Sequence, residues 1–222
     1  MKSSLNGRLK KSFEILGDIK GKKILDVGCK GAWLEKHIYK NKIGIKEMHS
    51  FDVKDHEFPK LGKRIKFRVD SVLDMKKYFG ANFDIAAFYE VIEHLPKKTE
   101  LIALQNINKS LKRGGILCLS TPNRSFFSNL LDPAYYIMGH RHYSKEQIRI
   151  MLNKSGFVIV KNEIKGGFGE LFSMIFYYIF KHLLRSRKLG LNLFEKRKEY
   201  EYGLDYNGFA NIFIVARKAR DL

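Results

Sequence analysis

Cysteine is scarce in this chain, and its hydrophobic runs are short. The two cysteines, Cys29 and Cys118, lie in apolar, strand-like surroundings. We therefore expect reduced cytosolic side chains and no disulfide or metal framework. The longest apolar run, residues 171–180, is too short to cross a bilayer. Residues 1–11 are basic but lack an apolar segment, so no signal peptide is expected and a cytoplasmic location is predicted.

Acidic residues are outnumbered, with 23 Asp and Glu against 42 Lys and Arg and a net charge of +19. Such a charge favours RNA, an anionic membrane surface or an acidic substrate as a partner. The basic residues are scattered over residues 60–68, 185–188 and 196–198, which a solvated lysine-rich surface explains equally well. The length and the apolar content of 45% fit one folded domain with an insertion.

A short apolar run followed by glycines predicts a ligand-binding turn. Residues 23–27 are typical of a buried parallel strand, Gly28 and Gly31 end it, and residues 32–38 resume with helical spacing. A strand, a glycine turn and a helix bring backbone N–H groups close to a nucleotide-like ligand. Ordinary strand-to-helix turns share this pattern, so the turn alone does not show that a ligand binds there.

The remaining periodicity alternates between strands and helices. Strands are expected at 47–53, 65–69, 83–89, 116–119, 157–160 and 212–216, and helices at 8–19, 101–111 and 145–152. This alternation predicts an open, doubly wound α/β sheet with ligands at the carboxyl ends of its strands.

Two of these strands end in an aspartate. Asp52 comes 21 residues after Gly31, where a carboxylate can accept both hydroxyls of a ribose. Asp70 with Ser71 ends the next strand and can serve an adenine amino group. A turn or helix cap is the structural alternative for both aspartates.

These segments together resemble the class I S-adenosylmethionine-dependent methyltransferases. The resemblance rests on residues 24–29, 69–71, 83–84, 90–95 and 111–115 and on Asp52, in that family's order and spacing. Residues 143–157 also look like the branch acting on small molecules and lipid-like quinone precursors. The resemblance implies a seven-stranded Rossmann-like sheet with an antiparallel last strand, and S-adenosylmethionine as cofactor.

The resemblance also implies roles for single residues at the strand ends. The first loop faces the methionine part of the cofactor, Asp52 the ribose, and Asp70 with Ser71 the adenine, while Tyr89 and Glu90 lie beside the transferring methyl group. The loop residues implied are Asp26, Gly28, Cys29 and Gly31. Asp26 has a competing role as an organiser of the loop backbone.

One departure from the family concerns the loop, which usually reads Gly-x-Gly-x-Gly. Here Lys30 stands at the middle glycine and Ala32 at the third. Lysine at a positive φ would be strained, so we expect Gly31 to take the tight turn through a one-residue deletion. The alternative is a catalytically silent scaffold that binds the cofactor weakly or not at all.

Methyl transfer from a sulfonium mainly requires alignment and exclusion of water, with a base where the acceptor holds its proton. His94, together with Glu90, is the candidate; a helix-start histidine bonded to backbone is the structural alternative. Glu90, Glu93 and His94 also have a spacing that suits Mg²⁺ or Mn²⁺, with His142 as a later ligand. This spacing resembles ubiquinone-pathway O-methyltransferases and small-RNA 3′-terminal 2′-O-methyltransferases.

The stretch before the last strand is longer than the family's usual hairpin. We expect a core of residues 1–163 and 209–222 and a helical insertion over 164–208. Within it, residues 168–184 are predicted to form a lid helix over the active-site mouth, helped by residues 135–137. A dimer interface and contact with an anionic membrane stay open, because basic residues follow the apolar helix.

The sequence thus predicts a methyltransferase that uses S-adenosylmethionine to methylate a small or lipid-like acceptor at oxygen. The alternatives are an RNA 2′-O-methyltransferase with a Glu-x-x-Glu-His metal site and the silent scaffold.

Overall fold

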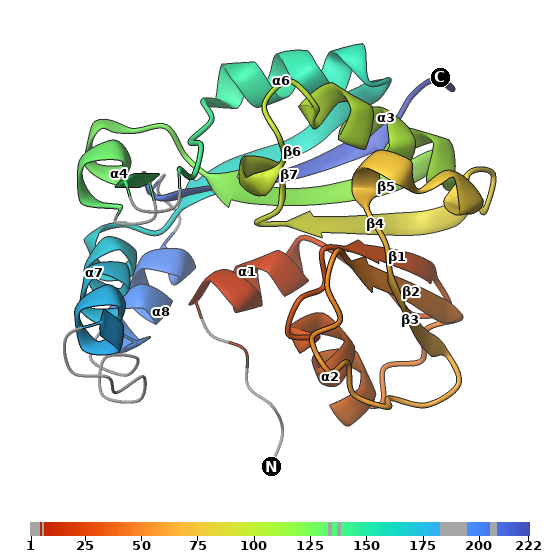
Figure 1. The fold of residues 1–222 in the computed structure, drawn as a ribbon, viewed down its shortest axis with the longest axis horizontal. Helices are drawn as coiled ribbons and strands as arrows, with labels where there is room; N and C mark the ends of the chain where they lie inside the picture. Colours follow the sequence, from red (N-terminus) through yellow and green to blue (C-terminus); the bar gives the residue numbers. More distant parts are fainter. Residues whose placement is uncertain (1–4, 6, 133–134, 137–138, 183–194, 205–207) are drawn as a thin grey trace.

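A seven-stranded sheet forms the centre of the protein (Figure 1). The computed structural model describes the chain except for residues 1–4, 6, 133–134, 137–138, 183–194 and 205–207. The strands are β1 (Lys23–Val27), β2 (Glu47–Asp52), β3 (Ile65–Val69), β4 (Phe83–Tyr89), β5 (Leu111–Pro122), β6 (Phe157–Lys165) and β7 (Asn211–Lys218). Their order across the sheet is β3-β2-β1-β4-β5-β7-β6. Strands β1 to β5 are parallel, and β7 runs antiparallel to both β5 and β6, which confirms the predicted fold class.

Helices cover both faces of the sheet and the edge where the parallel strands end. They are α1 (Gly7–Glu14), α2 (Trp33–Lys40), α3 (Glu100–Ser110), α4 (Phe126–Leu131), α6 (Lys145–Lys154), α7 (Phe168–His182) and α8 (Glu195–Gly203). Short 3₁₀ turns lie at Val72–Asp74, Lys76–Tyr78 and Ile92–His94. Helices α3 and α6 pack on one face, and α1 and α2 on the other (Figure 1).

Both faces of the sheet are buried, which explains the unbroken apolar runs of its central strands. Leu25 and Val27 of β1 point into the core under α3 and α6, and Ile24 points into the core under α1 and α2. Along β4, Phe88 and Ile85 divide between the two cores in the same way. The alternation fixes which strand-end side chains can reach a ligand and which stay beneath a helix.

The predicted elements form, with some of their ends displaced. The helix expected over 8–19 ends at Glu14, and the strand expected over 157–160 continues to Lys165. The helix expected over 168–184 is α7, of which residues 183–184 lie outside the described residues. Within the described part of the chain, no helix is long and apolar enough to cross a membrane.

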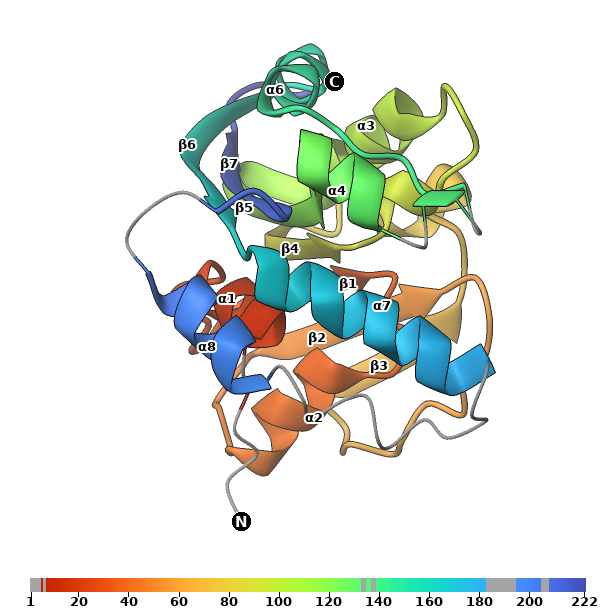
Figure 2. The same ribbon diagram turned by 90° about the vertical axis from the view of Figure 1, so that its left-hand side faces the viewer.

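Helices α7 and α8 follow β6 and precede β7, and they lie at the carboxyl edge of the sheet. Viewed from that edge, α7 runs across the front of the ends of β1, β2 and β3, with α8 and α1 at its side (Figure 2). This is the edge where an open parallel sheet binds its ligands.

Candidate active site

The loop between β1 and α2 is packed against the loop that follows β4. Gly28 has a φ of +81°, and a Cβ added to it would lie 2.4 Å from Cγ2 of Val91. Glycine is required there by conformation and by space. The backbone N–H groups of Gly28 and Cys29 both donate to the carbonyl of Phe51, at 2.9 and 3.1 Å. The end of β2 therefore anchors the start of the loop.

The expected shift of Gly31 into the tight turn is wrong. Lys30 has a φ of +34° and Ala32 a φ of +53°, whereas Gly31 has no positive φ and an open Cβ position. The N–H of Lys30 donates to Oδ2 of Asp52 at 2.9 Å. This bond to a carboxylate holds Lys30 in a conformation that normally favours glycine.

The two strand-end aspartates differ in how their oxygens are occupied. Asp52 accepts from the N–H groups of Lys30 and Lys54, at 2.9 and 3.3 Å, and lies 3.3 Å from Nε2 of His56. A carboxylate has about four lone-pair sites, so Asp52 keeps capacity for a hydroxyl donor. Asp70 accepts from the N–H of Ser71 at 2.9 Å and forms an ion pair with Lys77. The Ser71 hydroxyl caps the following 3₁₀ turn.

Asp26 lies beneath the loop, beside a second buried carboxyl group on α2. Asp26 is 4% exposed and Glu35 is fully buried. Burial, followed by the adjoining Glu35, raises the pKa of Asp26 well above its usual value. Burial also raises the pKa of Glu35. Cys29, predicted with this loop, is buried as well, and burial raises its thiol pKa.

Tyr89 is placed under α1. Its hydroxyl donates to the carbonyl of Ser12 at 2.7 Å, and its ring is buried. Strand β4 presents this side chain to the core under α1, whereas the resemblance implied a place beside the transferring methyl group.

Glu90, the next residue, is held by two short hydrogen bonds. Nη1 of Arg8 donates to Oε2 and Oγ of Ser120 donates to Oε1, both at 2.6 Å. Glu90 also has a φ of +56°, a costly conformation for a non-glycine residue that is typical of functional sites. Arg8 belongs to α1, 82 positions earlier in the chain.

Two further glutamates surround the same arginine. Oε1 of Glu170, in the first turn of α7, lies 3.9 Å from Nε of Arg8, and the Glu170 side chain is nearly buried. Oε2 of Glu93 accepts from the Thr121 hydroxyl at 3.0 Å. Burial and then Glu90 raise the pKa of Glu93 well above its usual value.

His94 lies next to a second histidine from the chain after α4. The ring centroids of His94 and His140 are 4.2 Å apart in an edge-to-face arrangement. Burial, and then the neighbouring ring, lower the pKa of His94, and burial first lowers that of His140. His94 is therefore neutral at neutral pH and able to accept a proton.

The predicted metal cluster is not formed. Glu90 is bonded to Arg8 and Ser120, and Glu93 to Thr121. His142 lies elsewhere, with Nε2 2.9 Å from Asp132 and Nδ1 2.8 Å from Asn129. In the part of the chain that is described, no three His, Cys, Asp or Glu side chains are placed to share an ion.

Sequence reasoning missed Arg8, Glu35 and Glu170. Arg8 and Glu170 come from helices far from the strand-end motifs, and nothing in their spacing points to Glu90. Glu35 had a usable signal, since it stands between the buried Leu34 and Ile38 on the inner side of α2. His140 was one of two histidines in residues 139–143, and the structure brings it to His94 in place of His142.

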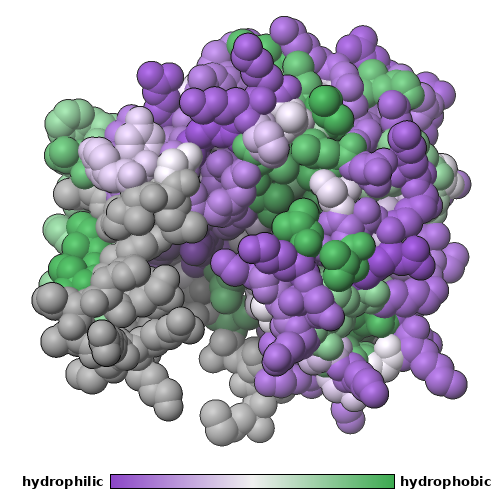
Figure 3. Space-filling view, in the orientation of Figure 1, coloured by the Kyte–Doolittle hydropathy of each residue, from purple (hydrophilic) through white to green (hydrophobic). Residues whose placement is uncertain are grey.

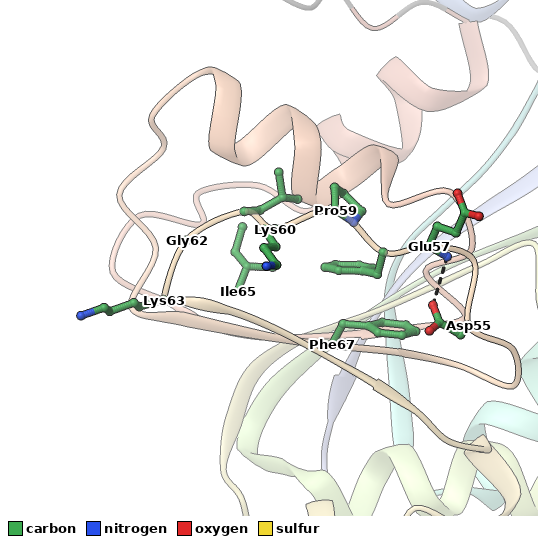
Figure 4. Close-up of a pocket in the computed structure, with 10 residues that line it drawn as sticks. Asp55, Glu57, Pro59, Lys60, Gly62, Lys63, Ile65 and Phe67 are labelled. Carbon is green, nitrogen blue, oxygen red and sulfur yellow. Dashed lines mark hydrogen bonds between the residues drawn. The ribbon is translucent and has the colours of Figure 1, made fainter.

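An open cavity lies outside this constellation. It measures about 510 Å³ and lies over β3 and the loop before it, which contains no helix (Figure 4). Phe58 stacks on Phe67 at its floor, with ring centroids 4.5 Å apart. None of the predicted site residues lines it.

The strand-end residues fit S-adenosylmethionine, which is cationic at sulfur. Carboxyl groups from β1, α2 and β2 surround the loop, Asp52 keeps acceptor capacity, and the buried Glu35 oxygens lack a donor among the described residues. This set of residues is acidic and short of hydrogen-bond donors. A cation would balance its charge, and ribose hydroxyls would supply donors.

Comparison with known proteins agrees with this fold and this arrangement of strand ends. Residues 1–162 match the methyltransferase domain family, and the chain belongs to that family. The solved structure of a SAM dependent methyltransferase from Archaeoglobus fulgidus has a TM-score of 0.65 at 16% identity, covering 94% of this chain and 92% of that one. The class I methyltransferase fold expected from the sequence is thereby confirmed.

Curated relatives match a shorter part of the chain. The ubiquinone biosynthesis O-methyltransferase of Xanthomonas euvesicatoria pv. vesicatoria (strain 85-10) is 28% identical over 120 residues, covering 49% of this chain and 46% of that protein. The enzyme of the same name from Actinobacillus pleuropneumoniae serotype 7 (strain AP76) is 32% identical over 119 residues, covering 50% of each. The chain therefore spans about half the length of the curated relatives it matches.

Gly28→Ala is expected to destabilise the protein and disorder the loop, because the new methyl group would meet Val91 and require a positive φ. Backbone strain of this kind costs about 1–3 kcal/mol before the clash is counted. Gly31→Ala is the matched control, since its Cβ position is open, and it should change the free energy of unfolding little. Urea unfolding of both variants measures the difference, and equal stabilities would contradict this description of the loop.

Proposed function

We propose that this protein transfers a methyl group from S-adenosylmethionine to a hydroxyl oxygen of a small or amphipathic acceptor. The observation that carries the proposal is the pairing of two half-sites at one sheet edge. An acidic glycine loop ends β1, and an ordered carboxylate with a neutral histidine follows β4. The names of the curated relatives, which are O-methyltransferases, support oxygen as the acceptor atom.

The cofactor half-site consists of the first loop and the ends of β2 and β3. Asp26, Gly28, Cys29 and Gly31 would hold the methionine part, Asp52 the ribose, and Asp70 with Ser71 the adenine. Bound there, S-adenosylmethionine supplies a methyl group on a positively charged sulfur. The chain contributes alignment and water exclusion, which provide much of the acceleration in such reactions.

The acceptor half-site lies around His94 and Glu90. His94 accepts the proton of the acceptor hydroxyl as the oxygen attacks, and its lowered pKa keeps it in the basic form at neutral pH. Glu90 accepts a hydrogen bond from the acceptor and orients it. Arg8 and Ser120 fix the Glu90 carboxylate so that little reorganisation is needed.

The aromatic contacts of helix α7 favour the proposal that the acceptor is apolar or amphipathic. Phe168 packs against Phe127 of α4 and against Phe209, with ring centroids 5.0 and 4.9 Å apart. Hydrophobic residues gather over α4 and α7 in the space-filling view, at its left edge (Figure 3). In this proposal residues 164–208 form an insertion whose helix α7 is a lid. Glu170 links it to the acceptor half-site through Arg8.

S-adenosylmethionine and its demethylated product are expected to bind in calorimetry. Asp52→Ala should weaken binding by about 1–3 kcal/mol, because a ribose hydroxyl loses its acceptor. Asp55→Ala is the control, since Asp55 lines the outer cavity and bonds only the N–H of Glu57 among the described contacts. Absence of binding at millimolar cofactor would favour the silent scaffold.

A panel of acceptors tests the substrate class. Transfer of labelled methyl groups to hydroxylated aromatic compounds is expected to become more efficient as an alkyl chain is added, through a lower KM. Short RNAs serve as the rival panel, and the comparisons with relatives give them no support. Methylation of RNA, with affinity falling steeply with salt, would overturn the acceptor assigned here.

His94→Gln is expected to lower kcat by about 10²–10⁴-fold while leaving cofactor affinity unchanged, because only proton transfer is lost. In the native enzyme, kcat should fall on the acid side below pH ~6.5, since protonated His94 cannot accept a proton and its pKa is lowered. His49→Gln is the control, as His49 lies within β2 and lines a separate cavity. Initial rates across pH give both results, and an unchanged kcat would remove His94 from the mechanism.

A further inference from the structure

Two carboxyl groups, those of Asp26 and Glu35, are buried together beneath the glycine loop. Only Asp26 retains any exposure to solvent. Asp26 retains 4% exposure at the end of β1, whereas Glu35 on α2 has none. Among the described residues neither oxygen of Glu35 has a hydrogen-bond partner. Ser50 on β2, whose Cα pairs with that of Asp26 across the sheet, lies beside Glu35, and its hydroxyl has no hydrogen-bond partner among the described residues either.

A buried acceptor without a donor is unfavourable, and two neighbouring buried carboxylates that are both ionised are more so. One proton held between Asp26 and Glu35 relieves both problems, because it supplies a donor and removes one negative charge. Paired carboxyl groups in proteins commonly titrate in this way.

None of the neighbouring groups described below replaces the shared proton as a donor to the pair. Asp52 on β2 faces Asp26, and Lys36 on α2 acts on Glu35. Cys29 in the loop and Tyr89 on β4 also face the pair, but burial raises the pKa of each, so both are neutral. The ammonium group of Lys36 is directed to the carbonyl of Gly31, at 2.9 Å.

We propose that Asp26 and Glu35 share one proton in the free protein and release it when the cofactor's cation binds above them. Glu35 is then a positioning residue, which acts on the cofactor through Asp26. The inference rests on the proposed function, because it requires S-adenosylmethionine at this loop. The proton passes to solvent, and the only covalent bond broken is the O–H bond of the protonated carboxyl group.

Release of a proton makes the binding enthalpy depend on the buffer. Calorimetry of the full chain with S-adenosylmethionine, in phosphate and in Tris near neutral pH, should give enthalpies that differ by the buffers' ionisation heats times about one proton. Cofactor affinity should also rise with pH, by up to about tenfold per pH unit below the apparent pKa of the pair.

Glu35→Gln keeps the shape of the side chain and removes the shared proton. We expect this variant to bind the cofactor with no buffer dependence and with an affinity that no longer varies with pH. Glu146→Gln, an exposed carboxyl on α6, is the matched control and should release the same number of protons as the native protein.

Equal enthalpies in the two buffers for the native protein, with the cofactor bound, would overturn the inference and leave the proposed function intact. A Glu35→Gln variant that still releases a proton would also overturn it. Absence of cofactor binding in every buffer would instead contradict the proposed function and, with it, this inference. The native measurement needs no variant, so it decides even if Glu35→Gln fails to fold.

Discussion

The end of β2 is the constraint on which the rest of the site depends. The carbonyl of Phe51 and the carboxylate of Asp52 together accept three backbone N–H groups of the neighbouring loop. Bonds of this kind stabilise a loop by satisfying its backbone donors, and bonds to a carboxylate are stronger than those to neutral acceptors. They hold Lys30 at a positive φ, bring Gly28 against Val91, and so join the cofactor loop to the loop that carries Glu90.

The molecule as a whole is positively charged, whereas its candidate site is rich in carboxyl groups. The chain carries a net charge of +19, yet carboxyl groups outnumber cations at the strand ends. Asp26, Glu35 and Asp52 lie around the first loop, and three glutamates surround Arg8. A local excess of carboxyl groups favours a cationic ligand over an anionic one, whatever the charge of the outer surface. Composition alone pointed toward anionic partners and could not reveal this separation.

Strand positions and the grouping of strand-end residues could be predicted from the sequence. Hydrophobic runs and glycine turns act locally, and the carboxyl ends of parallel strands must meet at one edge. Side-chain direction was less accessible. Tyr89 and Glu90 are neighbours, yet one is buried under α1 and the other faces Arg8. The positive φ of Lys30 depends on a hydrogen bond to the end of the next strand, and His140 meets His94 from a distant part of the chain, so neither has a signature in local spacing.

The position of β7 has a consequence for the order in which the protein can fold during synthesis. This strand lies between β5 and β6 and pairs with both, although it follows both in the chain. While the ribosome is making the residues before β7, β5 and β6 each have an unpaired edge. Unpaired strand edges invite association with other chains. The sequence of β6 offers little alternation of apolar and charged residues to oppose such association. Helices α7 and α8 are made in that interval, so the sheet can be completed only after both have been synthesised.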